Sequence, residues 1–513
     1  MNSSSGYGGT SSSSGALLQL LAVGKMDEYL SKNASKTHFR HSYNKTTPFS
    51  IESVTQSFSG SPAFSGESQC CIARAGDLLW KQYIKIVLPG LRAVRRDDVP
   101  ATNQPAFAAA DCNLTACADR QIYLGWVQDG YTDASDNTKE RMLNDGAEKW
   151  QEQRYGCAPV PAGYGQTTLF DAPEFDACWW TECAPLACLR RVELRVGGSV
   201  VDVAWSELLY ILDELSGKSG LRCEELIGRT HRQVSKLVHA SREEQTFYVP
   251  MPWYFTGGWG NGGVAGGSHA ASLALPICAL QFHNVSVNVQ WQNLAHLIIK
   301  SHCDIVVLDS KTGQPINDNS LKAELENVFI HLDTHERDSV ISHPGTFLIT
   351  QHAAKKVTVN TATVDVSLGM SFCVTCMFFV IRRRAARDSG DLFNFAGIGG
   401  RPALESACLN INNASRVAPK PEPFWRLLSA YQHFSSMPLG RIYSYSFALD
   451  PLKITEPTGS LNMSRLDSCN LELALQPEFG TTSADSESEL FIFCRNWNVL
   501  TIKSGLCSLA FSS

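Results

Sequence analysis

Three cysteines in the stretch CWWTECAPLAC, at positions 178, 183 and 188, are the first residues whose type and spacing suggest chemistry. Structural zinc sites use cysteines two to four residues apart, most often as C-x-x-C. Here four residues separate Cys178 from Cys183 and Cys183 from Cys188, which fits zinc poorly. We therefore favour packed free thiols, and a metal site or a disulfide within this segment stays open as an alternative.

A second pair, Cys373 and Cys376 in SFCVTCMFFV, does have the C-x-x-C spacing. The β-branched and aromatic residues around it predict a strand. Residues three apart on a regular strand point to opposite faces of the sheet. We therefore expect these two thiols to be packed as small hydrophobic groups and not to share a metal ion.

The glycine-rich stretch GGWGNGGVAGG, residues 257–267, contains glycines with the spacing of a dinucleotide-binding turn. Such a turn must lead directly into a helix whose N-terminus faces the pyrophosphate. Further glycines and the strand-like SLALP follow instead, so we interpret the stretch as a connection between strands.

Two charged clusters are candidates for acid–base or nucleic-acid chemistry. FIHLDTHERD contains His331 and His335, but it lies at the end of a predicted strand, where charged residues are usually solvated or ion-paired. The basic run Arg382–Arg384 is too short for a nucleic-acid groove, and we interpret it as a solvated guard at a strand edge. G-x-S-x-G, H-E-x-x-H and P-loop motifs are absent from the sequence. We therefore predict no catalytic residue, no cofactor and no enzyme activity.

Bulk composition indicates a protein that buries much of its surface against partners. Charged residues form 18% of the 513 residues, below the roughly 25% of typical soluble domains. The net charge of −6 gives no basic field for nucleic acid. No run of about 18 apolar residues would span a membrane, and the N-terminal MNSSSGYGGTSSSSG lacks the features of a signal peptide. We expect a cytosol-like site of synthesis, where Asn113 is only a weak candidate for glycosylation.

From about Phe49 the sequence follows the period-two alternation of half-buried strands. LRRVELRVGG, the helical run VAWSELLYILDELSG and TFYVPMPWYF occur in this order, which SACLNINNASR, EPFWRLLSAYQHF and RIYSYSFALDP later repeat. About eight strand-like runs per repeat predict an all-β protein of two tandem, eight-stranded antiparallel jelly rolls. Short helices in the loops and one long inserted loop complete this prediction. A barrel or a pair of immunoglobulin-like sandwiches is also compatible with the pattern.

Several of these runs resemble the major capsid proteins of nucleocytoplasmic large DNA viruses, most closely those of algal viruses. SFSGSPAFSGESQCCIARAGDLLWKQYIKIVL is similar to the opening strands of that family. FYVPMPWYF with SLALPICALQFHNVSVNVQW, and then FIHLDTHER, resemble the end of its first jelly roll. RIYSYSFALDPLKITEPTGSLNMSRLDS is the most specific match.

The resemblance implies a chain organised around two jelly rolls. We expect a partly mobile N-terminal arm at 1–37, a first jelly roll at 38–336, a linker at 337–344 and a second jelly roll at 345–513. The long insertion, at about 91–186, is expected to form an exterior cap. Trp179, Trp180 and Trp259 are expected to be exposed aromatic side chains, which suit contacts between subunits.

The function implied by the resemblance is that of a structural capsid protein. It would form homotrimers, as pseudo-hexagonal capsomers that tile an icosahedral shell, after assembly in the host cytoplasm. Its partners would be neighbouring capsomers and minor capsid proteins, with indirect contact to an internal membrane and no direct contact with nucleic acid. A minor capsid paralogue and a carbohydrate-binding surface module, with CWW at 178–180 as its aromatic platform, are the alternatives.

Overall fold

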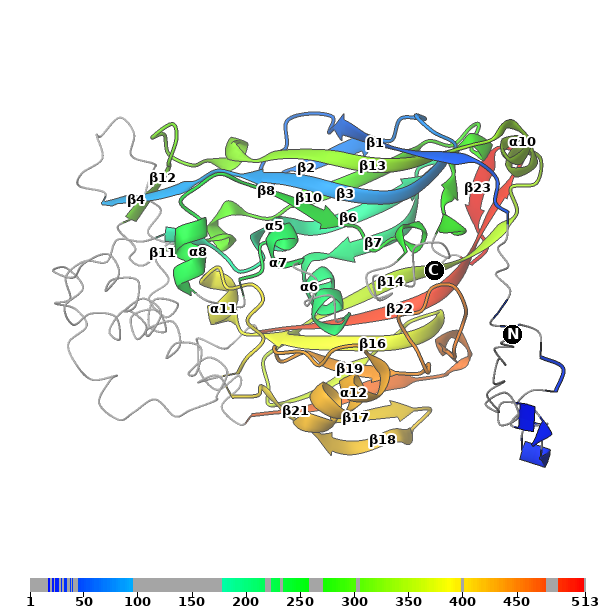
Figure 1. Ribbon diagram of the computed structural model, residues 1–513. Coiled ribbons are helices and arrows are strands. Elements are labelled where there is room, and N and C mark those ends of the chain that lie inside the picture. The colour runs from blue at the N-terminus through cyan, green and yellow to red at the C-terminus, as the bar shows by residue number, and fades with distance from the viewer. Residues whose placement is uncertain are drawn as a thin grey trace, which may run out of the picture. The chain divides into compact units, whose positions relative to one another are not determined.

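The structure is a computed structural model that describes residues 45–95, 178–216, 223–230, 234–257, 271–300, 305–397, 401–476 and 488–511, with scattered residues between 17 and 39. The chain divides into two compact units, Met1–Pro48 and Phe49–Ser513. The second unit contains all the strands described below, and Figure 1 shows its sheets.

The first half of the second unit is a sandwich of two antiparallel sheets. One sheet has the strand order β1-β13-β3-β8, and the other has the order β2-β10-β6-β7. These strands are β1 (Phe49–Ser57), β2 (Glu67–Cys71), β3 (Leu78–Leu88), β6 (Leu189–Val196), β7 (Ser199–Trp205), β8 (Gln245–Pro250), β10 (Val285–Trp291) and β13 (Lys322–Leu332), and a short strand β9 (Leu275–Pro276) also pairs with β3.

The second half repeats this arrangement. Its sheets have the orders β14-β22-β16-β19 and β15-β21-β17-β18, which correspond strand for strand to the orders of the first half. The strands are β14 (Thr346–Val359), β15 (Thr363–Ser367), β16 (Cys373–Arg382), β17 (Leu404–Ile411), β18 (Ala414–Pro421), β19 (Tyr443–Ser446), β21 (Cys469–Leu475) and β22 (Ser488–Lys503), with β20 (Leu461–Asn462) and β23 (Leu506–Leu509) added at the sides. The predicted duplication of an all-β unit is therefore confirmed.

Short helices lie in the connections between strands, as predicted. Among the described residues of the second unit, the α-helices are α5 (Ala184–Cys188), α6 (Ser206–Leu215), α7 (Cys223–Ile227), α8 (Val234–Ala240), α10 (Thr334–Ser342), α11 (Arg384–Asp388) and α12 (Ser429–His433), and α12 continues the π-helix η11 (Phe424–Leu428). Single 3-10 turns are η6 (Tyr254–Thr256), η7 (Ile277–Ala279), η8 (Leu294–His296), η9 (Asp318–Ser320) and η12 (Met463–Arg465). Residues 337–344, which the sequence suggested as a linker, fall mostly within α10.

The two halves also use the same hairpin between equivalent strands. Gly197 and Gly198 join β6 to β7 with φ of 59° and 85°, and Asn412 and Asn413 join β17 to β18 with φ of 48° and 61°. Two successive positive φ angles match the twist of a hairpin, and glycine and asparagine reach them at the lowest energy. A helix then follows each hairpin, α6 after β7 and η11–α12 after β18, in the order that the sequence predicted.

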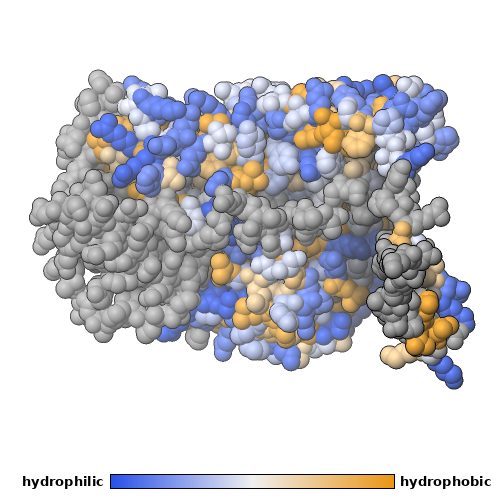
Figure 2. All heavy atoms as spheres, in the orientation of Figure 1, coloured by the Kyte–Doolittle hydropathy of each residue, from blue (hydrophilic) through white to orange (hydrophobic). Residues whose placement is uncertain are grey.

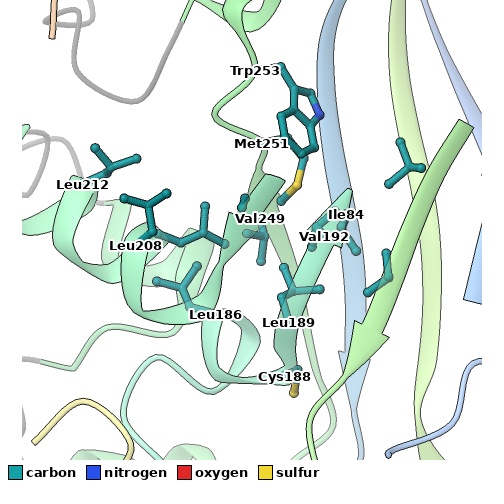
Figure 3. Packing of buried hydrophobic residues seen from close by; sticks show 14 of the residues in the cluster. Ile84, Leu186, Cys188, Leu189, Val192, Leu208, Leu212, Val249, Met251 and Trp253 are labelled. Atoms are coloured by element: carbon teal, nitrogen blue, oxygen red, sulfur yellow. The ribbon is translucent and has the colours of Figure 1, made fainter. Parts of the chain in front are cut away.

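The sheets of the two halves succeed one another from the top to the bottom of Figure 1. Helix α6 lies between them, and all of its residues are buried. Figure 3 shows side chains of α5 and α6, such as Leu186 and Leu208, packed in the core of the first half beside Val192 of β6 and Val249 of β8. The same hydrophobic cluster extends to Phe378 of β16 in the second half.

The structure differs from the expectation at both ends of the predicted insertion, about 91–186. Its first residues form strand β4 (Leu91–Arg95), which pairs with β12 (Ile305–Asp309). Its last residues include strand β5 (Cys178–Trp180), which pairs with β11 (Ile298–Lys300), and helix α5. The two partner strands both lie between β10 and β13, so the ends of the segment are fixed to the sandwich. The prediction of a single loop is therefore wrong for these ends, and residues 96–177 lie outside the described residues.

The hairpin at Gly197 provides a test of the fold. A Cβ atom at Gly197 would clash with the imidazole ring of His283, whereas one at Gly198 would meet nothing within 4 Å. Both Gly197→Ala and Gly198→Ala carry the cost of a positive φ, about 1–2 kcal/mol, and only Gly197→Ala adds overpacking, about 1–3 kcal/mol. Urea denaturation should therefore show the larger loss of stability for Gly197→Ala. Equal losses would contradict the close approach of His283.

Candidate functional site: the joint between the two jelly rolls

The three cysteines of the predicted metal candidate are buried in the hydrophobic core of the first half. Cys178, Cys183 and Cys188 are 5%, 0% and 0% exposed, respectively. Burial raises the pKa of Cys178 to about 12 and also raises the pKa values of Cys183 and Cys188, which keeps the thiols protonated. Among the described residues, no group of three or more histidine, cysteine or acidic side chains is arranged to hold a metal ion. These cysteines pack as small hydrophobic groups and stay free.

The tryptophans beside them do not form an exposed platform. Trp179 is 4% exposed and Trp180 is 5% exposed, and the indole of Trp180 donates a hydrogen bond to the carbonyl of Pro89 at 3.1 Å. Trp180 also stacks against Phe64, with ring centroids 6.3 Å apart. For these two tryptophans, the expectation of exposed side chains is therefore wrong, because β5 pairs with β11 and closes over the core.

The C-x-x-C pair also differs from its prediction. A β-bulge between Val374 and Cys376 adds one residue to β16, so Cys373 pairs with Trp497 and Cys376 pairs with Arg495. Two residues that are two apart on β22 face the same side, so Cys373 and Cys376 share a face of the sheet. The expectation of opposite faces was wrong, because it assumed a regular strand.

The remaining candidates of the sequence are dispersed or lie elsewhere. His331 contacts Glu52 through Nε2 at 3.1 Å, as a diagonal contact between β13 and β1 near the end of β13. Asn113 and residues 258–267 of the glycine-rich stretch lie outside the part of the chain that the structure describes.

The joint between the two halves contains a buried cluster of charges that the sequence did not predict. Nη1 of Arg382 lies 2.8 Å from Oε1 of Glu207 in α6, and its Nη2 lies 2.6 Å from Oε2 of Glu489 in β22. The three side chains are 5%, 8% and 6% exposed, respectively. Arg382 therefore links the first half to the second, and its interpretation as a solvated guard was wrong.

Two more cations surround the carboxylate of Glu489. Nζ of Lys356 lies 2.6 Å from it, and Nη1 of Arg387 lies 3.2 Å from it. Burial alone would raise the pKa of Glu489, but Arg382 and Lys356 outweigh burial and lower the pKa to about 2. Glu489 thus stays ionised in the folded protein across the ordinary pH range.

A second polar contact joins the edges of β7 and β14. The carboxylate of Asp202 accepts a hydrogen bond from the backbone N–H of His352 at 2.8 Å, and its other oxygen lies 3.1 Å from Nδ1 of the same histidine. The side-chain amide of Gln351 donates to the carbonyl of Val201. Both contacts bridge the two halves, and they satisfy polar groups that the joint removes from water.

The C-terminal end of α6 is fixed in a similar way. Arg229 forms buried ion pairs with Asp213 at 2.6 Å and Glu214 at 2.5 Å. Glu214 also accepts a hydrogen bond from the backbone N–H of Leu439 in the second half at 2.9 Å. Two acidic residues at a helix C-terminus oppose the helix dipole, so the arginine offsets an unfavourable arrangement.

Aromatic contacts complete the joint. Tyr210 of α6 stacks on Phe393 with ring centroids 4.4 Å apart, and Trp205 contacts Phe493 at 5.8 Å. The buried ion pairs, the hydrogen bonds between β7 and β14 and the stacked rings have a structural role, which is to hold the two sandwiches in one orientation. Within the described residues, no helix is both long and apolar enough to cross a membrane.

Comparisons with known proteins assign the fold to a class. The chain superposes on the PBCV-1 VP54 structure with a TM-score of 0.62 at 19% identity, covering 93% of this chain and 100% of the other. It superposes on the Faustovirus major capsid protein with a TM-score of 0.61 at 12% identity, covering 95% and 96%. The fold is that of the double jelly-roll capsid proteins, as the sequence predicted.

Family models and relatives make the assignment specific. The model "Major capsid protein N-terminus" matches residues 37–107 and 160–333, and "Large eukaryotic DNA virus major capsid protein" matches residues 336–508. The major capsid proteins of Pyramimonas orientalis virus and Paramecium bursaria Chlorella virus 1 are 23% and 22% identical, each over 97% of this chain and 100% of the relative. The chain belongs to the major capsid proteins of large eukaryotic DNA viruses. It is a structural protein of the virion and belongs to a family whose members are not enzymes.

The buried arginine makes the joint testable. Arg382→Met leaves the carboxylates of Glu207 and Glu489 buried without their shared cation, which should lower the free energy of unfolding by about 3–5 kcal/mol. Arg384→Met is the matched control from the same basic run, because Arg384 is 38% exposed and should contribute at most about 1 kcal/mol. Urea denaturation measures both losses. A similar small loss in the two variants would show that the ion pairs of Arg382 contribute little to the free energy of unfolding, against this prediction.

The depressed pKa of Glu489 also predicts a pH dependence. A carboxyl group with a pKa of about 2 when folded, against its ordinary value of 4.5, adds stability above pH 4.5 that is lost as the pH falls towards 2. Glu489→Gln lacks this contribution, so the difference in stability between wild type and variant should shrink by up to about 3 kcal/mol over that interval. Urea denaturation of both proteins at several pH values measures the difference, and a constant difference would refute the prediction.

Proposed function

We propose that three copies of this chain form a pseudo-hexagonal capsomer and that such capsomers tile an icosahedral shell. The observation that carries the proposal is the strand-for-strand correspondence of the two halves. Each chain therefore has two similar jelly rolls, and each jelly roll would form one of the six wedge-shaped parts of a hexagon. Three chains would then supply the six wedges of one capsomer. Membership of the capsid protein family supports this use of the duplication.

The contact between the two halves joins two unlike surfaces, which is the kind of contact that can build a ring. Elements of the first half, β7 and α6, meet a different surface on the second half, the sheet β14-β22-β16-β19. A contact between unlike surfaces can be repeated from one unit to the next, and it closes into a ring when the rotation allows. A chain that carries one such contact internally leaves one surface of each kind for other copies.

The proposal extends to organisation and partners. We retain the division into an arm at 1–37, a first jelly roll at 38–336, a linker at 337–344 and a second jelly roll at 345–513. Neighbouring capsomers and minor capsid proteins would be the partners, with indirect contact to an internal membrane and assembly in the host cytoplasm. A minor capsid paralogue is the alternative, since the sequence relatives include two different capsid proteins of Acanthamoeba polyphaga mimivirus. The carbohydrate-binding alternative has lost its aromatic platform, because Trp179 and Trp180 are buried.

The mass of the purified protein in solution tests the trimer. One chain has a mass of 56.3 kDa, and size exclusion coupled to light scattering should give a species of three times that mass. Stable interfaces between separately folded chains typically bury about 1,200–2,000 Å², which predicts a trimer that persists at micromolar concentration. A monomer under these conditions would contradict the proposal and favour the paralogue.

A further inference from the structure

The second half leaves exposed the elements that correspond to the buried joint of the first half. In the first half, β7 and α6 cover the neighbouring sheet, and all ten residues of α6 are buried. Their counterparts by strand order are β18 and the η11–α12 helix. Of the eight residues of β18, only Val417 is buried.

Four apolar side chains project from this exposed region, and we call them the α12 ridge. Leu428 and Tyr431 lie three residues apart on one face of the helix and are 44% and 75% exposed. Met437 is 52% exposed and Leu449 is 81% exposed, and Leu449 lies next to the helix because its carbonyl is 3.3 Å from Nδ1 of His433. Figure 2 shows hydrophobic residues gathered on the lower half of the drawn face, where Figure 1 labels α12 and β19.

The opposite partner surface is partly exposed on the first half, where its central residues are half-buried. The sheet β14-β22-β16-β19 is covered by α6 and β7, and its counterpart is the sheet β1-β13-β3-β8. Strand β16 is buried on both faces, whereas β3 alternates between buried and half-buried residues. The uncovered face of the first sheet, which we call the outer sheet face, carries Phe49, Ile51, Tyr83, Lys85, Tyr248, Glu324 and Glu326.

We propose that the α12 ridge of one copy docks on the outer sheet face of a second copy. This contact would repeat between chains the contact that α6 makes within the chain. It rests on the proposed trimer and identifies the surfaces that would hold it together. The occupant of each surface is therefore another copy of this chain.

Charge on the two surfaces is complementary. Beside the ridge, β18 exposes Arg416 and Lys420. On the outer sheet face, Glu326 accepts hydrogen bonds from the hydroxyls of Ser53 and Thr55, which leave its negative charge in place. Glu324 is 41% exposed in its pair with Lys85.

The outer sheet face has the composition of a contact between separately folded chains. Tyrosine and other aromatic side chains lie among charged groups, whereas Phe378 and Val380 occupy the corresponding face of β16. Surfaces that associate after folding combine aromatic anchors with a polar rim, and those that never separate resemble a protein core.

A photo-crosslinker placed on the ridge tests the proposal directly. The full-length chain with p-benzoyl-phenylalanine in place of Tyr431 is irradiated as a mixture of isotopically light and heavy copies, and mass spectrometry locates the links between copies. We expect links to residues 49–57, 78–88, 245–250 or 322–332 of the second chain. The control carries the same group in place of Phe282, which is 71% exposed and lies outside both surfaces. It should give no links to those four strands.

A variant provides the second measurement. Tyr431→Glu combined with Leu449→Glu should weaken the affinity between the subunits of the trimer roughly 30-fold or more, which is the effect of losing one interface hot spot. The control Phe282→Glu should leave the trimer intact. A wild-type trimer that links elsewhere, or that survives the double substitution, would overturn the docking surface and leave the trimer standing. A wild-type monomer would overturn both proposals.

Discussion

The sheet β14-β22-β16-β19 presents apolar side chains on both faces, and this constraint governs how the two halves combine. One face packs on the core of its own sandwich, and the other requires a cover. Helix α6 supplies the cover and is itself completely buried. Arg382 is the last residue of β16, a strand of this sheet that is buried on both faces. Removing its guanidinium from water is costly without nearby carboxylates. Glu207 and Glu489 meet that requirement from opposite sides of the joint.

The features that the sequence predicted are those that depend on local pattern. Alternation at period two and helical spacing in VAWSELLYILDELSG each act over a few positions. Because both halves repeat these patterns in the same order, the duplication of an all-β unit follows from the pattern alone. The pattern left a barrel or a pair of immunoglobulin-like sandwiches open, and the resemblance to capsid proteins favoured the jelly roll.

The features that were missed depend on residues far apart in the chain. Strand β5 finds its partner in β11, and β4 in β12, across more than a hundred residues each. The bulge beside Thr375 reverses the alternation of β16, which local spacing does not reveal. One signal was present in the sequence, however. The run CVTCMFFVIR has no polar alternation, which is typical of a strand buried on both faces, so the arginine that ends it needed a buried partner.

Strands β4 and β5 hold the two ends of the intervening segment through their pairs with β12 and β11. The entropy of closing a loop between fixed ends grows only with the logarithm of its length, so doubling the length costs about 0.6 kcal/mol. The stability of the sandwich therefore depends only weakly on the number of residues between Arg95 and Cys178. A segment of another length or sequence between these two anchoring strand pairs would therefore leave the geometry of the sandwich almost unchanged.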